Sequence, residues 1–511
     1  MENYKISRSG GRLKGTIPMY VAGLIVTIGT VLLLSAALSQ PGLAIRGIAI
    51  ALVGIVVGLL LAGWIAGKRA FGPAMGVVLA CQLLMFVGRP LYAATFQDSH
   101  NLFTGAPYSS FYVVAQLIAG AGFVSLCVGY GLGFRNKPPH ALASSSGPHP
   151  VQPIGETDWT LLRPLLVWLA ILGTGLYVFY IAQSGWSAYW QTTLSGRSEQ
   201  YFSSVQAASG YLTSGLRFAT GALLLLFCQA WVSGNRNAQV ISLIFLSLAL
   251  FPQVAAGSRS SFIPLALALT VFVMRTSPSL LPVRRVLLWL PFFFVLAVIA
   301  PRIWRDGLSR GGSLVDSVRL AITPDQVFGQ FLGGLDTAMI DAFQVQVAAQ
   351  ANGVLTLQHG STYLAAMGSW IPRSVWAEKP GSVDEILNMA LFPETALRGI
   401  GFAFGFYSEP MFNFGVVGVC IVAALFGYFL GRFSRILRTS SDLIQVYVGV
   451  LVVGYSFVIM RGNLTFDIQR LLVSVIPVVA CVVVARAFRT TDRSSMTRGT
   501  LHSVTKTKAA S

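Results

Sequence analysis

Charged residues are scarce in this chain, and acidic residues are scarcer than basic ones. Only 11% of the 511 residues are charged, whereas soluble domains carry about 25%. The hydrophobic share is 54% and the mean hydropathy is +0.68. This composition excludes an ordinary soluble globular protein and predicts an all-α polytopic membrane protein.

The chain also has few cysteines and lacks the common metal and nucleotide motifs. All five cysteines fall inside apolar runs, which argues against a disulfide framework and against paired thiolate ligands for a metal. The sequence contains no H-x-x-x-H, D-x-D or Walker-type pattern. It therefore predicts no metal ion and no other cofactor.

Twelve apolar runs reach, or come close to, the length of about 20 residues that a helix needs to cross a bilayer. The runs are continuous, whereas the strands of a β-barrel alternate between polar and apolar residues. The predicted spans are 17–38, 47–66, 71–89, 111–133, 161–183, 211–232, 237–254, 260–275, 285–301, 411–432, 443–461 and 468–487. The first run lacks a small-residue cleavage site, so we expect a retained span and not a signal peptide.

The net charge of +18 is an orientation signal. If the N-terminus lies inside, 22 of the 36 basic residues but only five of the 18 acidic residues fall in cytoplasmic segments. This distribution follows the positive-inside rule and predicts that both termini are cytoplasmic. The basic balance therefore needs no nucleic acid partner to explain it.

The spans and connections divide the chain into six segments. We expect N-terminal transmembrane helices 1–4 in 1–135, a flexible cytoplasmic linker in 136–160 and helices 5–9 in 161–301. A large external loop follows in 302–401, then helices 10–12 in 402–487 and a basic cytoplasmic tail in 488–511, expected to be disordered. A loop of that length is unusual among otherwise short connections, and it directs the search for function.

Three stretches of the large loop have recognisable local patterns. An amphipathic helix is predicted to start at Thr323 and to run through Phe343 along the membrane surface. Ser382 and Glu385 form a capping box that opens a short helix ending near Ala390. The segment from Trp370 to Pro380 is aromatic and cationic, and its two prolines disfavour regular structure.

Cations gather on the predicted external side, against the orientation rule. A guanidinium matches phosphate oxygens in a two-pronged geometry, so this set favours a binding site for an anionic diphosphate. The alternative for each residue is contact with lipid headgroups or pairing with nearby acids. The cations are Arg217, Arg259, Arg302, Arg305, Arg373, Lys379, Arg461 and Arg470.

Acidic residues in the same region are candidates for a general base, which must reach the attacking hydroxyl directly or through one water. They are Asp306, Asp336, Asp341, Glu378, Asp384, Glu385, Glu409 and Asp467. Structural explanations exist for several. Asp467 lies between two arginines, Glu385 caps a helix, and Glu409 precedes an apolar helix as its N-terminal acid. His359 adjoins the cationic loop and is a surface residue, a general base or a contact to the diphosphate.

Several of these segments resemble the bacterial oligosaccharide repeat-unit polymerases, the Wzy-type O-antigen and capsule polymerases. The resemblance rests on Gly360–Leu364, on Trp370–Pro380 with Arg373, Trp376 and Lys379, and on Ser408–Gly418 with Glu409, Asn413 and Gly415. Gly257–Ser261 and Arg461–Asn463 are similar to other arginine-bearing helix ends of that family. The similarity covers about the C-terminal half of the chain.

The resemblance implies a membrane glycosyltransferase with a glycosyltransferase C-like architecture. Such an enzyme transfers a growing glycan from undecaprenyl diphosphate to a lipid-linked repeat unit on the external face of the inner membrane. Lipid-linked donor and acceptor, membrane lipids and a polysaccharide chain-length regulator are the implied partners. The expected diphosphate-binding residues are Arg259, Arg302, Arg373, Lys379, Arg461 and Arg470, and the expected catalytic residues are Glu409, Asp467 and His359. Trp370, Trp376 and Tyr363 fit an interfacial aromatic belt better than a sugar-binding face.

Three other functions compete with this interpretation. A flippase or secondary transporter also has about twelve spans, but transporters tend to have repeated halves and polar residues at mid-membrane. An O-antigen ligase uses the same donor and differs only in its acceptor. A channel or structural membrane protein would have no need of the cationic loop.

Overall fold

The computed structural model describes residues 42–66, 72–96, 100–135, 150–186, 206–255, 259–280, 334, 337–368, 371, 375–376, 378, 381–397 and 401–508. Within these residues every regular element is a helix. The order is α2 (Leu43–Ala66), α3 (Pro73–Leu83), η2 (Leu84–Gly88), α4 (Arg89–Thr95), α5 (Ser110–Arg135), α6 (Glu156–Ser184), α9 (Gln206–Val232), α10 (Arg236–Ala255), α11 (Arg259–Thr276), α15 (Met339–Ala351), α16 (Ser361–Met367), α17 (Val383–Leu391), α18 (Pro393–Leu397), α19 (Ser408–Thr439), α20 (Leu443–Arg461) and α21 (Leu464–Lys508).

Nine segments of the described chain are long and apolar enough to cross a membrane, and Ser260–Thr276 is a shorter apolar helix. Together they account for ten of the twelve predicted spans. The other two, 17–38 and 285–301, lie outside the described residues. The all-helical, multi-pass character expected from the hydropathy is therefore confirmed for the part of the chain that the structure covers.

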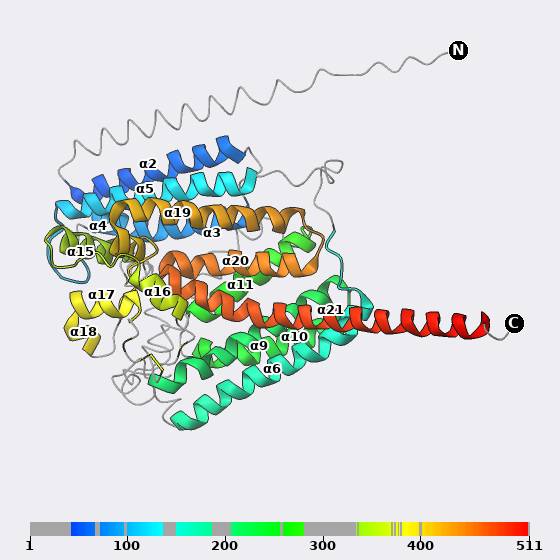
Figure 1. Ribbon diagram of the computed structural model, residues 1–511. Coiled ribbons are helices and arrows are strands. Elements are labelled where there is room, and N and C mark those ends of the chain that lie inside the picture. Colours follow the sequence, from blue (N-terminus) through cyan, green and yellow to red (C-terminus); the bar gives the residue numbers. More distant parts are fainter. Residues whose placement is uncertain are drawn as a thin grey trace, which may run out of the picture.

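The long helices run side by side, and the C-terminal three lie in the middle of the bundle (Figure 1). Helix α19 packs along α5, α20 contacts α3, α11 and α19, and α21 contacts α9 and α6. The short helices α15–α18 gather at one end of the bundle (Figure 1), where α4 and α20 end and where α5, α19 and α21 begin. We call this the loop end and the opposite one the tail end.

Small residues allow the closest contact in the bundle, between α5 and α19. A Cβ atom on Gly129 or Gly133 would collide with the backbone carbonyl oxygens of Ala424 and Tyr428. Membrane helices associate through this kind of backbone approach, because lipid provides no hydrophobic force to drive them together. The contact fixes α19, which carries the candidate site, against the N-terminal helices.

The span Pro73–Thr95 contains a π-helical turn, η2, just before Arg89. Pro90 has no N–H, so the carbonyl of Phe86 loses its usual helical donor four residues on. The side-chain amide of Gln116 on α5 donates to that carbonyl instead, at 3.0 Å. Single π turns of this kind often lie next to functional or strained positions, and here the turn precedes a buried arginine.

Two expectations for the helix predicted in 323–343 were wrong, namely its extent and its position on a membrane surface. The helix expected from Thr323 to Phe343 is absent at Gly334, which lies in a bend, and at residues 337–338, which form a turn, and α15 begins only at Met339. Residues 323–333 and 335–336 lie outside the described residues. Met339 and Phe343 are fully buried, so α15 packs inside the protein and not on a membrane surface.

The capping box is confirmed, since Ser382 accepts a hydrogen bond from the Glu385 backbone and opens α17.

The basic tail was expected to be disordered, but α21 continues without interruption to Lys508 and projects beyond the tail end (Figure 1). Its sequence after Arg486 is a poor helix former. A helix that is already anchored extends at little cost, however, because each added residue contributes a hydrogen bond without a new nucleation step.

Candidate active site

The candidate site begins at a kink in α19. Gly415 has φ 66°, which interrupts the helix and favours glycine at that position. Three carbonyl groups in the preceding turn accept hydrogen bonds from outside α19. The donors are Gln350 Nε2 to Met411 (3.1 Å), the Gln358 backbone to Phe412 (3.1 Å) and the His359 backbone to Asn413 (3.0 Å). The kink thereby attaches the segment before α16 to the first turn of α19.

Glu409 lies in this first turn and connects three helices. Its side chain is fully buried. One carboxylate oxygen accepts from the hydroxyls of Thr362 on α16 (3.1 Å) and Thr465 on α21 (2.6 Å), and the other accepts from the Thr465 backbone N–H (3.0 Å). Because the carboxylate satisfies an N-terminal amide of α21, it also complements the positive end of that helix.

Asn413 reinforces the same junction from one turn further along α19. Its amide nitrogen donates to the Thr362 hydroxyl at 2.7 Å, and its amide oxygen accepts from the Gly360 backbone at 3.0 Å. Thr362 therefore accepts from Asn413 and donates to Glu409, so its hydroxyl orientation is fixed. The two segments Gly360–Leu364 and Ser408–Gly418, whose residues resembled the polymerases, are directly hydrogen-bonded to each other.

The turn between α20 and α21 brings in the third segment. Asn463 caps α21, accepting from the Phe466 backbone at 2.9 Å, and its amide nitrogen donates to Asp384 of α17 at 2.6 Å. Asp467 accepts from Arg470 at 2.8 Å in an ion pair one turn apart. The pairing of Asp467 with a flanking arginine, considered from the sequence, is therefore confirmed for Arg470.

The cations of this turn remain partly available to a ligand. The Arg470 guanidinium lies 4.1 Å from the centre of the Phe466 ring and is about one fifth exposed, and its buried Nε has no hydrogen-bond partner among the described residues. Arg217 on α9 and Arg461 at the end of α20 both interact electrostatically with Asp467. A guanidinium with unused donors beside two further arginines is suited to binding phosphate oxygens.

The three carboxyl groups of the site differ in their surroundings. Asp384 lies outside the apolar spans, and burial raises its pKa to about 7, helped by the negative charges of Asp467 and Glu409. Hydrogen bonding from Asn463 and the charge of Arg470 act in the opposite direction. Asp384 therefore changes its protonation state close to neutral pH.

The structure brings together four of the predicted site residues, namely Glu409, Asp467, Arg461 and Arg470. The backbone of His359 is bonded to α19, but its imidazole is exposed. Tyr363 stacks on Phe414, with ring centres 5.8 Å apart and planes within 5°. Arg302, Trp370, Arg373 and Lys379 lie outside the described residues, and Arg259 begins α11 without a described side chain. Within the described ranges, no group of three or more His, Cys, Asp and Glu residues is placed to hold a metal ion.

Sequence reasoning missed the neutral residues that hold the site together. Thr362, Asn413, Asn463 and Thr465 were not nominated as site residues, because their side chains carry no charge. Three of them, Thr362, Asn413 and Asn463, lie inside the segments that resembled the polymerases, and that position was the available signal.

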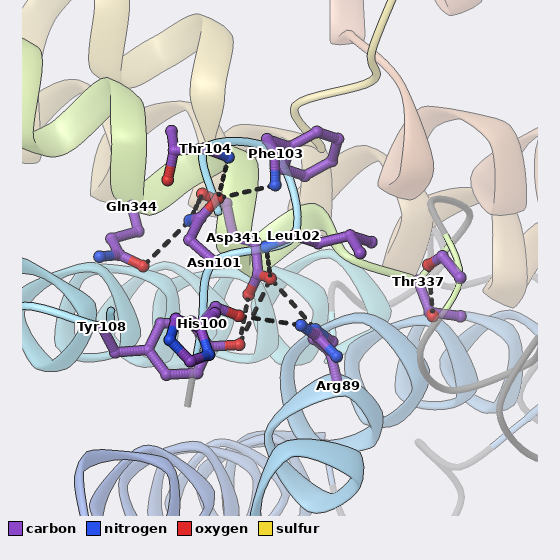
Figure 2. Close-up of polar contacts among 11 residues, drawn as sticks. Arg89, His100, Asn101, Leu102, Phe103, Thr104, Tyr108, Thr337, Asp341 and Gln344 are labelled. Atoms are coloured by element: carbon purple, nitrogen blue, oxygen red, sulfur yellow. Dashed lines mark hydrogen bonds and ion pairs between the residues drawn. The ribbon is translucent and has the colours of Figure 1, made fainter. Parts of the chain in front are cut away.

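Asp341, another acidic candidate, belongs to a separate buried cluster at the loop end, which Figure 2 shows. Its carboxylate accepts from Arg89 Nε of α4 at 3.1 Å, from the Tyr108 hydroxyl at 3.1 Å and from the Leu102 backbone at 2.9 Å. Arg89 is 1% exposed and also donates to the carbonyl of His100 at 3.0 Å. Asn101 donates to the Asp341 carbonyl at 2.8 Å.

This Arg89–Asp341 cluster holds α15 against the N-terminal helices. All its donors to the Asp341 side chain come from residues 89–108, while α15 supplies Gln346 and Gln350 to the carbonyls of Ser408 and Met411 on α19. A buried ion pair contributes little compared with apolar packing, but removal of one partner leaves an uncompensated charge. We interpret the cluster as a support for the site and not as part of its chemistry.

Comparison with known proteins decides the family. The family model described as O-antigen polysaccharide polymerase Wzy matches residues 24–491. The chain belongs to the Wzy family. No curated protein and no solved structure is significantly similar to it. Membership confirms the predicted resemblance and makes the chain a multi-pass membrane protein that polymerises O-antigen polysaccharide. The match also extends the similarity from the C-terminal half to nearly the whole chain.

Replacing Glu409 by Gln tests the junction. The amide would present an N–H₂ group to donors, leaving at least one buried donor unsatisfied at a cost of about 1–3 kcal/mol. We expect a lower thermal midpoint in detergent and loss of polymer. Glu394→Gln, an exposed change on α18, should alter neither. Thr465→Ser keeps the hydroxyl that donates to Glu409 and should be tolerated, whereas Thr465→Val removes this hydroxyl and should not be tolerated. An E409Q protein as stable and active as the wild type would contradict the junction role of Glu409.

Replacing Asp341 by Asn tests the support. The change removes the Asp341 charge from its pair with the buried Arg89, and we expect the free energy of unfolding to fall by about 3–5 kcal/mol. Asp158→Asn is the matched control, because it breaks the pair with Arg489, whose side chain is 39% exposed; exposed pairs contribute about 0–1 kcal/mol. Thermal or denaturant unfolding in detergent measures both, and equal effects of the two changes would be inconsistent with the proposed support.

Proposed function

We propose that this Wzy-family protein joins undecaprenyl diphosphate-linked oligosaccharide repeat units on the external face of the bacterial inner membrane. The observation that carries the proposal is the convergence of three chain segments at the loop end. Gly360–Leu364, Ser408–Gly418 and the turn after Arg461–Asn463 are far apart in sequence, yet the Glu409 carboxylate accepts hydrogen bonds from Thr362 and Thr465 and thereby connects them. The site lies where a membrane-bound substrate would present its diphosphate.

Charge placement supports an outward-facing loop end. At the tail end, α19 finishes with Arg432, Arg435 and Arg438, and Arg275 of α11 donates to the α19 carbonyls of Leu437 and Ser440 at 2.9 and 3.2 Å. Cytoplasmic ends of spans are rich in arginine and lysine. In this proposal the tail end and both termini are cytoplasmic, and the membrane is crossed twelve times in a glycosyltransferase C-like arrangement.

In the reaction, the leaving group is a lipid diphosphate, so stabilisation of its developing negative charge is the main task. We assign this task to Arg461 and Arg470, which meet at the α20–α21 turn, with Arg259, Arg302, Arg373 and Lys379 as further diphosphate-binding residues. Of the three catalytic residues expected from the sequence, Glu409 and Asp467 are assigned here to holding the junction and the Arg470 guanidinium, and His359 stays a catalytic candidate. Lipid-linked donor and acceptor are the substrates, and a chain-length regulator is a proposed partner.

Two related functions remain distinguishable by experiment. A flippase would move the same lipid-linked unit across the membrane without forming a bond. A ligase would pass a finished polymer to a different acceptor. The family match favours neither, because the family is described as a polymerase.

The test is to delete the gene and to measure the length and the membrane face of the lipid-linked glycans, with restoration by the intact gene as the control. The proposal predicts single repeat units on the outer face. Single units confined to the cytoplasmic face would indicate a flippase, and long polymer still attached to its carrier would indicate a ligase. An unchanged glycan profile would contradict every glycan-based function.

A further inference from the structure

The three carboxyl groups of the candidate site, those of Glu409, Asp467 and Asp384, are not equally able to accept a proton from a substrate. Glu409 is fully buried and both its oxygens accept hydrogen bonds from Thr362 or Thr465. Asp467 is 3% exposed and paired with Arg470. An incoming hydroxyl would have to displace these partners before either carboxylate could accept its hydrogen bond. Neither group is well placed to accept another proton.

Asp384 differs from both. One of its oxygens accepts a single hydrogen bond, from the neutral amide of Asn463 at 2.6 Å. Among the described residues no group donates to the other oxygen, and no arginine or lysine forms an ion pair with this carboxyl. The residue as a whole is only half-buried, whereas Glu409 and Asp467 are buried. Asp384 is therefore the carboxylate at this junction with an unused acceptor.

The backbone around Asp384 is fixed from two sides. Asn388 donates to the Asp384 carbonyl at 2.7 Å and also exchanges two hydrogen bonds with the Phe402 backbone, at 2.9 and 2.8 Å. Asn463 contacts the carboxylate while its oxygen caps α21. The Asp384 side chain is thus bonded to Asn463, which follows Arg461 by two residues on the turn that would bind the diphosphate. A base must be positioned in this way relative to the bond that breaks.

We propose that Asp384 is the general base of the polymerisation, an assignment that rests on the proposed function. The hydroxyl oxygen of the acceptor sugar attacks the anomeric carbon of the donor glycan and forms the new glycosidic bond. The bond between that carbon and the diphosphate oxygen breaks, and the lipid diphosphate leaves with the electron pair. The hydroxyl proton passes to the free oxygen of Asp384, which later releases it to water.

The charges that face Asp384 support this role. Burial is the main cause that raises the pKa of Asp384 to about 7. The negative charges of Asp467 and Glu409 add to this shift, while the hydrogen bond from Asn463 and the positive charge of Arg470 oppose it. On the neighbouring helices, Glu394 of α18 is exposed and Asp341 of α15 is paired with Arg89. On α17 itself, Glu385 is exposed. A base that titrates near the working pH combines a useful deprotonated fraction with a strong affinity for the proton.

The test is polymerisation of lipid-linked repeat units by the purified full-length protein in liposomes. Asp384→Asn keeps the shape and the acceptor for Asn463 but removes the base, and we expect the rate to fall by about 100-fold or more. Binding of the lipid-linked donor should be retained. Glu385→Gln is the matched control on the same helix, because glutamine preserves the capping box, and it should keep the wild-type rate.

The pH profile separates catalysis from a structural role. The wild-type rate should rise about tenfold per pH unit below about pH 7 and then level off, since only the ionised carboxylate accepts a proton. D384N should show a low rate without this rise. A D384N protein within a few-fold of the wild type, or a wild-type rate that is flat from about pH 5.5 to 8.5, would overturn the assignment while leaving the polymerase function intact. If the folded wild-type protein forms no polymer, the proposed function fails and the assignment fails with it.

Discussion

The arrangement of the loop end depends on one buried carboxylate. Glu409 accepts from Thr362 and from both the hydroxyl and the backbone of Thr465, and so fixes α16, α19 and α21 relative to one another. The backbone N–H groups at the start of α21 need acceptors, and in an apolar environment an unsatisfied group is expensive. Glu409 meets this need with a negative charge, and the position of Arg461 and Arg470 follows from it.

Around this carboxylate, the helices are supported in layers. The glycine contact between α5 and α19 brings the N-terminal helices close to the site. The Arg89–Asp341 cluster then holds α15, and α15 in turn binds the first turn of α19 through Gln346 and Gln350. The result is a fixed polar surface at the end of an apolar bundle, which is the arrangement that a lipid-linked, anionic substrate requires.

The sequence predicted the parts of this structure that depend on local composition. Ten of the twelve apolar runs are helices because hydropathy and length alone determine a span, and Ser382 caps α17 because the capping box is a local motif. The pair of Asp467 and Arg470, one helical turn apart, was equally accessible. By contrast, Arg89 and Asp341 are 252 residues apart, and no local pattern indicates that they meet. The predicted helix from Thr323 was wrong at Gly334 and at residues 337–338, where a bend and a turn outweigh the apolar spacing.

The most direct test is a structure of the protein in a lipid nanodisc with a lipid-linked repeat unit bound. We predict that the diphosphate lies against the guanidinium groups of Arg461 and Arg470 at the loop end, with the acceptor sugar beside α17. A diphosphate bound at the tail end, next to Arg432, Arg435 and Arg438, would contradict the central claim that the junction organised by Glu409 is the active site.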